Sequence, residues 1–258
     1  MLNINPVPAL SDNYIWLIQN VASSHVAIVD PGEAGPVLTK IKEYDLKPVA
    51  ILITHHHWDH VNGIGELLKH FHIPVFGSAK ENVEHQTNAL GQGDQVELPE
   101  LELVLDIYDV PGHTAGAIAY FGQGMLFSGD TLFTAGCGKL FEGTPTQMHN
   151  SLSKLAALPG ETLLYCGHEY TQNNLVFAQA VEPDNPQISD RMDKVKELRE
   201  QGLPTVPALL AMEKETNPFL RTHQESVKKA ASQAAGKQLT EGADVLATIR
   251  HWKDHFSG

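Results

Sequence analysis

The most informative segment of this chain reads Thr54-His55-His56-His57-Trp58-Asp59-His60. The apolar, β-branched run at residues 49–53 comes directly before it and predicts a buried strand. Residues 61–68 follow it and predict a turn that enters a helix. The histidines and the aspartate therefore lie on a strand-to-helix loop, where side chains can point into a cleft. Because imidazole and carboxylate suit zinc, iron or manganese, we predict a metal site there rather than a solvated loop or a non-specific His-rich tract.

Three more predicted strands end beside a potential metal ligand. His113 follows the strand that ends at residue 110, Asp130 follows residues 125–128, and His168 follows residues 162–166. A glycine precedes each of these ligands, which allows the backbone to turn sharply and approach a site closely. Open sheets place their sites outside one end of the strands, so these loops can converge although they lie far apart in sequence.

The donor set is too large for one tetrahedral ion. It comprises His55, His57, Asp59, His60, His113, Asp130 and His168. Such a set suits two ions that share one carboxylate and leave room for a bridging water. In an extended loop the side chains of His56 and Trp58 point away, so we expect them to pack elsewhere. For Asp30, which ends a strand before Pro-Gly, we expect a turn-capping or outer-shell role rather than ligation.

The composition narrows the class of protein. The chain has 258 residues, 42% of them hydrophobic and 19% charged, which is typical of a soluble globular protein. A net charge of −13 argues against nucleic acid or an anionic membrane as the main partner, although a local basic patch could still bind a small anion. Cys137 and Cys166 are too few for a disulfide framework, and we expect small buried side chains. We find no signal peptide and no apolar run of ~18 residues, so we expect a cytoplasmic protein.

The chain divides into two parts by pattern. Strands and helices alternate through residue 170, with a predicted hairpin across Gly122-Gln123-Gly124. After residue 170 we expect helices and no strand. We therefore predict a domain of alternating strands and helices at 1–170 and a helical domain at 171–258, and the family resemblance described below implies that the first is catalytic and the second substrate-binding.

The metal motif resembles a known superfamily. His-x-His-x-Asp-His at 55–60, followed by Gly-His113, Gly-Asp130 and Gly-His168, is similar to the metallo-β-lactamase superfamily over roughly residues 10–170. That resemblance implies an α/β fold, an αββα sandwich with metals at one edge of the paired sheets.

Within that superfamily the chain resembles the glyoxalase II (hydroxyacylglutathione hydrolase) family over nearly its full length. The segments that carry the likeness are Asp12-Asn13-Tyr14, Thr54 to His60, Gly136-Cys137-Gly138-Lys139, Phe141-Glu142-Gly143-Thr144, Gly167-His168-Glu169-Tyr170-Thr171, Asn217-Pro218-Phe219-Leu220-Arg221 and Arg250-x-x-Lys253.

The family resemblance implies roles for particular residues. One metal would be bound by His55, His57 and His113, the other by Asp59, His60 and His168, and Asp130 would bridge them. Asp59 and Asp130 would act in catalysis. The cofactors would be two divalent metal ions, which we expect to be zinc, although iron or manganese could replace it. The glutathione site would comprise Lys139, Tyr170, Arg250, Lys253 and Phe141. Phe141 stands where the family has a tyrosine, so one hydrogen bond from a phenol is missing.

The same resemblance implies the reaction. The chain would hydrolyse S-D-lactoylglutathione, an S-2-hydroxyacylglutathione, to D-lactate and glutathione through a bridging hydroxide, as the second step of methylglyoxal detoxification. A thiolate leaves without a strong general acid, because a thiol pKa is only about 8.5. Arg250 and Lys253 lie three residues apart near the end of a helix and could bind a glutathione carboxylate, with Lys139 as a third cation. We expect a monomer.

Several alternatives share parts of this pattern. A persulfide dioxygenase with one iron would need fewer ligands, and a β-lactamase would not need a helical substrate-binding tail. An RNA-processing relative is disfavoured by the acidic balance. A metal-dependent binding module without catalysis would be expected to have lost ligands, and a flavodiiron-type protein to have replaced histidines with carboxylates.

Overall fold

The structure is a computed structural model that describes residues 1–256. Its internal contacts divide it into two units, which we treat one at a time. The first unit comprises residues 1–109 and 115–129, and the second comprises residues 110–114 and 130 onward. Our sequence-based domain boundary, 1–170 and 171–258, stays a prediction, and its last two residues lie outside the described part of the chain.

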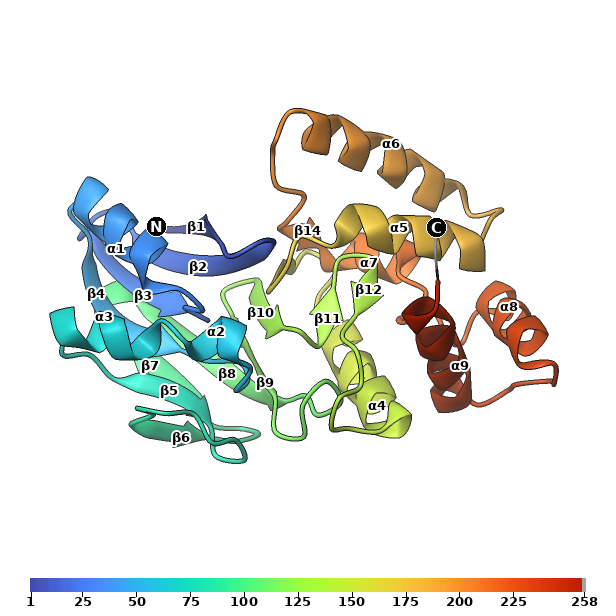
Figure 1. The fold of residues 1–258 in the computed structure, drawn as a ribbon, viewed down its shortest axis with the longest axis horizontal. Helices are drawn as coiled ribbons and strands as arrows, with labels where there is room; N and C mark the ends of the chain where they lie inside the picture. Colours follow the sequence, from blue (N-terminus) through green and yellow to red (C-terminus); the bar gives the residue numbers. More distant parts are fainter. Residues whose placement is uncertain (257–258) are drawn as a thin grey trace. The chain divides into compact units, whose positions relative to one another are not determined.

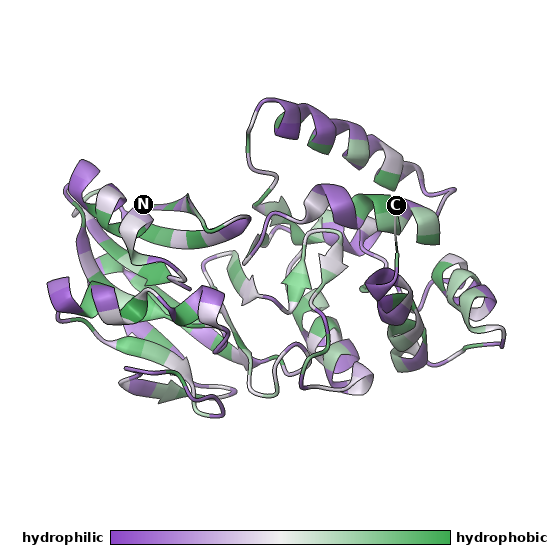
Figure 2. Cartoon of the chain, viewed as in Figure 1, coloured by the Kyte–Doolittle hydropathy of each residue, from purple (hydrophilic) through white to green (hydrophobic). Residues whose placement is uncertain are grey.

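A six-stranded sheet forms the centre of the first unit. In spatial order its strands are β1 (Leu2–Ala9), β2 (Asn13–Asn20), β3 (His25–Val29), β4 (Lys47–Leu52), β5 (Val75–Ser78) and β6 (Asn88–Leu90). The first three pair antiparallel, and β3 to β6 pair parallel. The inner strands are buried along most of their length, which explains their nearly continuous apolar sequence. Figure 2 shows these strands mostly in the green of hydrophobic residues.

Helices connect the parallel strands and cover one face of this sheet. They are α1 (Ala34–Glu43), the one-turn α2 (Trp58–Val61) and α3 (Ile64–His70). Val37 and Ile41 of α1, and Ile64 and Leu67 of α3, belong to the same buried cluster as the strand side chains. Figure 1 shows α1 and α3 running along the sheet. Parallel strands require such crossovers, so this packing holds the loop after β4 at one end of the sheet.

A second, antiparallel group of strands completes the first unit. It comprises β7 (Gln95–Leu98), β8 (Leu103–Asp109), β9 (Ile118–Gly122) and β10 (Met125–Gly129), with the one-turn η1 (Pro99–Leu101) between β7 and β8. The predicted hairpin is confirmed, with Gln123 and Gly124 at positive φ in its turn. Tyr120 of β9 is buried, and its hydroxyl donates to the backbone oxygen of Ile53 at 2.9 Å. This hydrogen bond joins β9 to the end of β4, just before the His-rich loop.

The second unit is mainly helical. Its elements are β11 (Leu132–Phe133), β12 (Gly136–Cys137), α4 (Pro145–Ala156), β13 (Leu163–Cys166), α5 (Thr171–Val181), α6 (Pro186–Glu200), β14 (Ala208–Leu209), α7 (Leu210–Thr216), α8 (Glu225–Ala235) and α9 (Gly242–Asp254). Helix α4 begins with a capping box between Thr144 and Gln147. Helix α9 packs on α4 and α8.

Two strands depart from the sequence-based expectation. The prediction of no strand after residue 170 is wrong, because the two-residue β14 pairs antiparallel with β13. Strand β1 was not predicted, because Pro6 and Pro8 lack an N–H group and break the usual strand pattern. It is an edge strand, where prolines are tolerated since one side of the strand needs no partner. Among the described residues, no helix is long and apolar enough to cross a membrane.

Candidate metal centre

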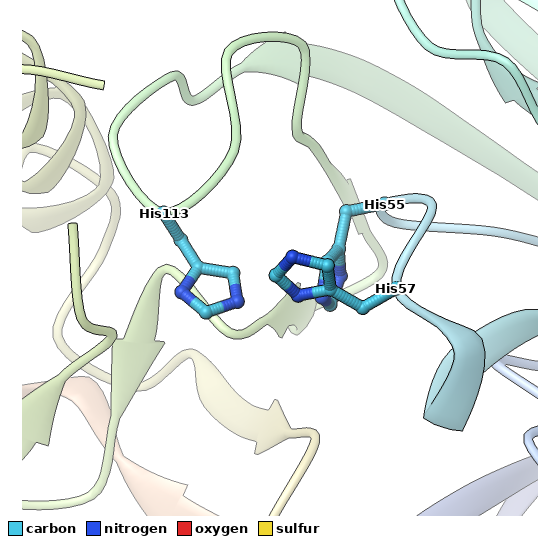
Figure 3. Close-up of side chains that lie close together, drawn as sticks. All are labelled: His55, His57 and His113. Atoms are coloured by element: carbon cyan, nitrogen blue, oxygen red, sulfur yellow. The ribbon is translucent and has the colours of Figure 1, made fainter. Parts of the chain in front are cut away.

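The His-rich loop leaves the end of β4 and enters α2 directly. His55 and His60 are buried, His57 and Asp59 are half-buried, and Trp58 is exposed. The exposure of Trp58 agrees with the expectation that it points away from the site. His56 also turns elsewhere, with its Nδ1 atom 3.1 Å from Oε2 of Glu81. Figure 3 shows the imidazoles of His55 and His57 projecting from this loop.

Asp30, at the end of β3, is buried behind this loop and binds it at three points. Its Oδ1 atom accepts the backbone N–H of Thr54 at 2.8 Å. Its Oδ2 atom accepts the Thr54 hydroxyl at 2.6 Å and faces Nδ1 of His60 at 3.1 Å. The sequence-based interpretation of Asp30 as an outer-shell carboxylate thus gains particular partners. The sequence marked Thr54 as part of the family motif but gave it no role, because hydrogen bonds to Asp30 and His55 cannot be deduced from a threonine that follows a strand.

These hydrogen bonds indicate which nitrogen of His55 and of His60 could bind a metal. A carboxylate only accepts, so His60 must donate from Nδ1 and keep its lone pair on Nε2. The Thr54 hydroxyl donates its hydrogen to Asp30, so it can only accept from Nδ1 of His55, which lies at 3.0 Å. His55 therefore also keeps its lone pair on Nε2. Metal-binding histidines are commonly oriented in this way by an outer-shell partner.

Asp59 is held in place by its neighbours in the first unit. The amide of Asn13 donates to Oδ2 of Asp59 at 3.0 Å and to its backbone oxygen at 3.3 Å. The same carboxylate oxygen lies 3.5 Å from Nε2 of His60. Gly32 passes so close that a Cβ atom there would stand 1.8 Å from the backbone oxygen of Asp59. The backbone approach explains the glycine, and Asn13 orients the carboxylate.

The second unit contributes three more ligand candidates that lie together. Oδ2 of Asp130 is 3.2 Å from Nε2 of His168 and 3.5 Å from Nε2 of His113. Nδ1 of His113 donates to the backbone oxygen of Lys139 at 2.8 Å, so His113 also presents the lone pair of Nε2. A single carboxylate oxygen therefore faces two imidazoles from different loops.

Gly138 is required beside these ligands. A Cβ atom at this position would stand 1.9 Å from the backbone oxygen of Asp130 and 2.9 Å from Nδ1 of His113. A non-glycine residue would displace the backbone of Asp130, because the nearer atom belongs to the backbone and cannot rotate aside, and would crowd the ring of His113.

Groups of histidine and aspartate that could hold a metal ion are present among the described residues. One of them, within the first unit, comprises Asp30, His55 and His60. Figure 3 also draws His113, whose imidazole projects from its own loop. Neutral imidazole and carboxylate are the donors that divalent transition metals take in proteins, and the tautomers deduced above present them correctly. The residues therefore fit a metal centre.

Aromatic rings line the second unit beside its ligands. Tyr170 stacks on His168 at 4.7 Å with an angle of 4° between the rings. The edge of the exposed Phe141 ring lies against His113, with centroids 5.3 Å apart. Lys139 lies between Asp130 and Phe141 in sequence, and its side chain is exposed. The predicted substrate-binding residues Lys139, Phe141 and Tyr170 thus lie next to predicted metal ligands in sequence or in space.

Arg250 and Lys253 both lie on α9, but they differ in surroundings. Arg250 is buried, and its guanidinium donates to the backbone oxygen of Cys137 at 2.8 Å and to Asp254 at 3.0 Å. Lys253 is half-buried over the ring of Phe177. Burial, and then the nearby Arg250 charge, lower the pKa of Lys253 to about 8. The spacing in sequence predicts the same role for the two cations, but the guanidinium of Arg250 is buried whereas the side chain of Lys253 is partly accessible.

Cys137 and Cys166 are both buried, as expected. Burial raises the pKa of Cys137 to about 11 and that of Cys166 to about 12. Both side chains are therefore neutral thiols at ordinary pH, and neither resembles a thiolate ligand.

Two family models match the chain. The model of the metallo-beta-lactamase superfamily matches residues 10–168, and the model described as hydroxyacylglutathione hydrolase C-terminus matches residues 169–256. The chain is 52% identical to the hydroxyacylglutathione hydrolase of Nitrosomonas europaea, over 100% of this chain and 98% of the relative. It is also 52% identical to the protein of that name from Aeromonas salmonicida, over 99% of this chain and 100% of the relative.

Solved structures share the fold. The crystal structure of ETHE1 from Myxococcus xanthus matches with a TM-score of 0.67 and 24% identity, over 99% of this chain and 90% of that one. The B3 metallo-beta-lactamase BLEG-1 matches with a TM-score of 0.64 and 22% identity, over 85% and 99%. At these identities the likeness concerns the fold alone. It confirms the expected two-sheet α/β sandwich followed by helices.

Proposed function

Because the chain belongs to the hydroxyacylglutathione hydrolase family of the metallo-β-lactamase superfamily, we propose that it hydrolyses S-D-lactoylglutathione to D-lactate and glutathione. This would be the second step of methylglyoxal detoxification. The proposal is supported by sequence identities of 52% and 50%, over nearly the full length, to proteins named hydroxyacylglutathione hydrolase. The imidazole and carboxylate groups of the site also support it. A monomeric state and a cytoplasmic location belong to the same proposal.

We propose two divalent ions, with zinc as the expected metal and iron or manganese as alternatives. The first would be bound by His55, His57 and His113, and the second by Asp59, His60 and His168. Asp130 would bridge the two. The observation that carries this assignment is Oδ2 of Asp130, which faces the Nε2 atoms of His113 and His168, one from each proposed set.

Bound divalent ions supply two effects, a lower pKa for coordinated water and polarisation of the thioester carbonyl. The residues of the chain do the rest. Asp30 and the backbone oxygen of Lys139 keep the proximal nitrogens of His60 and His113 protonated, so Nε2 stays available. Asn13 keeps the Asp59 carboxylate turned toward His60, where it would also orient the attacking water. Thiolate departure needs no proton donor, because a thiol pKa is about 8.5.

Glutathione would be bound in the second unit by Lys139, Phe141, Tyr170, Arg250 and Lys253. Glutathione carries two carboxylates, so an ammonium on a half-buried lysine is a suitable partner. Lys253 carries its charge below about pH 8 and loses it above, according to its lowered pKa. Arg250 would act beside it, with guanidinium donors already bound to Cys137 and Asp254. Phe141 would offer its exposed ring instead of a phenol hydroxyl, because its backbone N–H already donates to the backbone oxygen of His113 at 3.2 Å.

The proposal is tested by following the loss of thioester absorbance of S-D-lactoylglutathione with purified protein, with metal analysis on the same sample. We expect turnover with two metal equivalents per chain. Asp130→Asn should lower turnover by more than the ~100-fold typical for loss of an outer-shell partner. Asp45→Asn serves as the matched control, because Asp45 is exposed and lies far from Asp130 in sequence. Two bound metals without thioester hydrolysis would instead indicate another activity of the superfamily.

A further inference from the structure

The segment Asn217-Pro218-Phe219-Leu220-Arg221 carries family likeness, but the proposed reaction gives it no role. It follows α7 in the helical part of the second unit. Asn217 and Phe219 are both buried, and the Asn217 side chain reaches Phe133 and Gly136, a few residues after the proposed ligand Asp130. The segment therefore connects the helical region with the ligand-bearing loops of the same unit.

Asn217 binds the hairpin formed by β11 and β12. Its side-chain NH₂ group lies 3.1 Å from the backbone oxygen of Phe133, 2.9 Å from that of Gly136 and 3.2 Å from Oε2 of Glu213, and its two hydrogens are shared among these acceptors. Its Oδ1 atom accepts the backbone N–H of Phe219 at 3.1 Å, which orients the amide. Residues 133 and 136 face each other in the hairpin, so one amide spans both strands.

Glu213 of α7 holds the turn of the same hairpin. Its Oε2 atom accepts the backbone N–H of Ala135 at 2.6 Å, and Ala135 has a positive φ of 54°. Its other carboxylate oxygen pairs with Arg191 in a fully buried ion pair. Asn174 of α5 adds a hydrogen bond to the backbone oxygen of Thr134 at 2.9 Å. The hairpin is therefore bound by helical side chains at both strands and at its turn.

The hairpin is linked to the three proposed ligands of its unit, to His168 by a ring contact and to Asp130 and His113 through the residues that flank it. It begins two residues after Asp130 and ends two residues before Lys139, whose backbone oxygen accepts Nδ1 of His113. The edge of the Phe133 ring lies against His168, with centroids 5.9 Å apart. Shifting the hairpin would thus move Asp130, the acceptor that sets the tautomer of His113, and the ring that supports His168.

We infer that Asn217 is a positioning residue for the metal centre, acting through the hairpin Leu132–Cys137. Together with Glu213 it makes the helical region a support for the metal ligands and not only a place where glutathione binds. This inference rests on the proposed metal centre. Asn217 touches neither metal ligand nor substrate, so its effect must appear in metal retention.

The test compares the rate at which purified protein releases metal to a chromophoric chelator. Asn217→Ala removes the donors to Phe133 and Gly136, and we expect about tenfold faster release, the lower end of typical outer-shell effects. kcat for S-D-lactoylglutathione should fall while KM stays near the wild-type value. Release at the wild-type rate would overturn the inference.

Arg221→Ala is the matched control within the same segment. Arg221 is half-buried and forms an ion pair with the buried Glu182, and no hydrogen bond or ion pair of Arg221 in the described structure reaches the hairpin. It should destabilise the helical region without changing the rate of metal release. Equal acceleration in Arg221→Ala and Asn217→Ala would mean that general destabilisation causes the release, and would also overturn the inference.

A second variant keeps the test decisive if Asn217→Ala does not fold. Asn174→Ala removes only the hydrogen bond to Thr134, so we expect a smaller acceleration in the same direction. An unchanged release rate in Asn174→Ala would count against the inference. Failure of the proposed function is recognised separately, because it would appear in the wild-type protein as absence of metal or of thioester hydrolysis.

Discussion

Replacing Asp30 by asparagine should disable His60 as a metal ligand without removing any ligand atom. In the native protein, Oδ2 of Asp30 accepts hydrogen bonds from the Thr54 hydroxyl and from Nδ1 of His60. An amide NH₂ group in place of this oxygen can only donate. It would then face two other donors, the Thr54 hydroxyl and Nδ1–H of His60. His60 can relieve the conflict by moving its proton to Nε2, which is the nitrogen proposed to bind metal.

The cost can be worked out from these contacts. Hydrogen bonds to a charged group contribute about 1.5–3 kcal/mol each, so losing two gives a ceiling of about 3–6 kcal/mol. Because the two bonds share one oxygen they are not additive, and we expect a loss of about 3 kcal/mol in the free energy of unfolding. For a chain of this size that corresponds to a fall in Tm of roughly 6–12 °C. Metal affinity should fall about 10- to 100-fold.

Two assays measure the effect of Asp30→Asn. Thermal unfolding followed by circular dichroism gives Tm, and competition with a chromophoric chelator gives the zinc affinity. Asp45→Asn is a closely matched control, because Asp45 has the same positive φ of 49° as Asp30 but is exposed. A protein with asparagine at 30 that kept the Tm and zinc affinity of the control would refute the tautomer argument.

Three further outcomes are expected. Gly138→Ala should abolish metal retention, because the new Cβ would stand 1.9 Å from the backbone oxygen of Asp130. Gly35→Ala is the control, since open space surrounds that position and its Tm should change little. Equal metal content in the two variants would contradict this prediction. The pKa of Lys253 is about 8, so its charged form predominates below that pH and is lost above it. KM for the glutathione thioester should therefore rise between about pH 7 and 9. Lys253→Arg should flatten this dependence of KM on pH. Phe141→Tyr should lower KM by up to about tenfold, since one added hydrogen bond contributes about 0.5–1.5 kcal/mol, and an unchanged KM would show that the hydroxyl finds no partner.

Much of the candidate site could be predicted because its ligands follow strand ends. The strand before the His-rich loop, the glycines before His113, Asp130 and His168, and the spacing at 55–60 are all local features of the chain. Local patterns are readable since neighbouring residues share one strand or one turn, whose geometry depends little on the rest of the protein. The seven ligand positions were therefore proposed without coordinates, and they stay a prediction.

Other features depend on partners that are distant in sequence. Burial of Arg250 against Cys137 joins residues separated by 113 positions, and Asn217 reaches Phe133 across 84. Strand β1 escaped prediction because its prolines are acceptable only at an edge, which the sequence does not reveal. In each case the deciding contact comes from packing, so a side chain such as an arginine looks identical in sequence whether it is solvated or buried.

The amino-acid sequence alone determined the family resemblance, the donor set and the alternation of strands and helices, because these are encoded in composition and short-range order. The tertiary structure alone decided how Thr54, Asp30 and the backbone of Lys139 bind Nδ1 of His55, His60 and His113, which leaves Nε2 of each as the nitrogen proposed to bind metal. It also decided that Asn217 supports the hairpin beside Asp130. Hydrogen bonds between distant segments set these details, and their direction depends on atomic positions that no spacing of residues specifies.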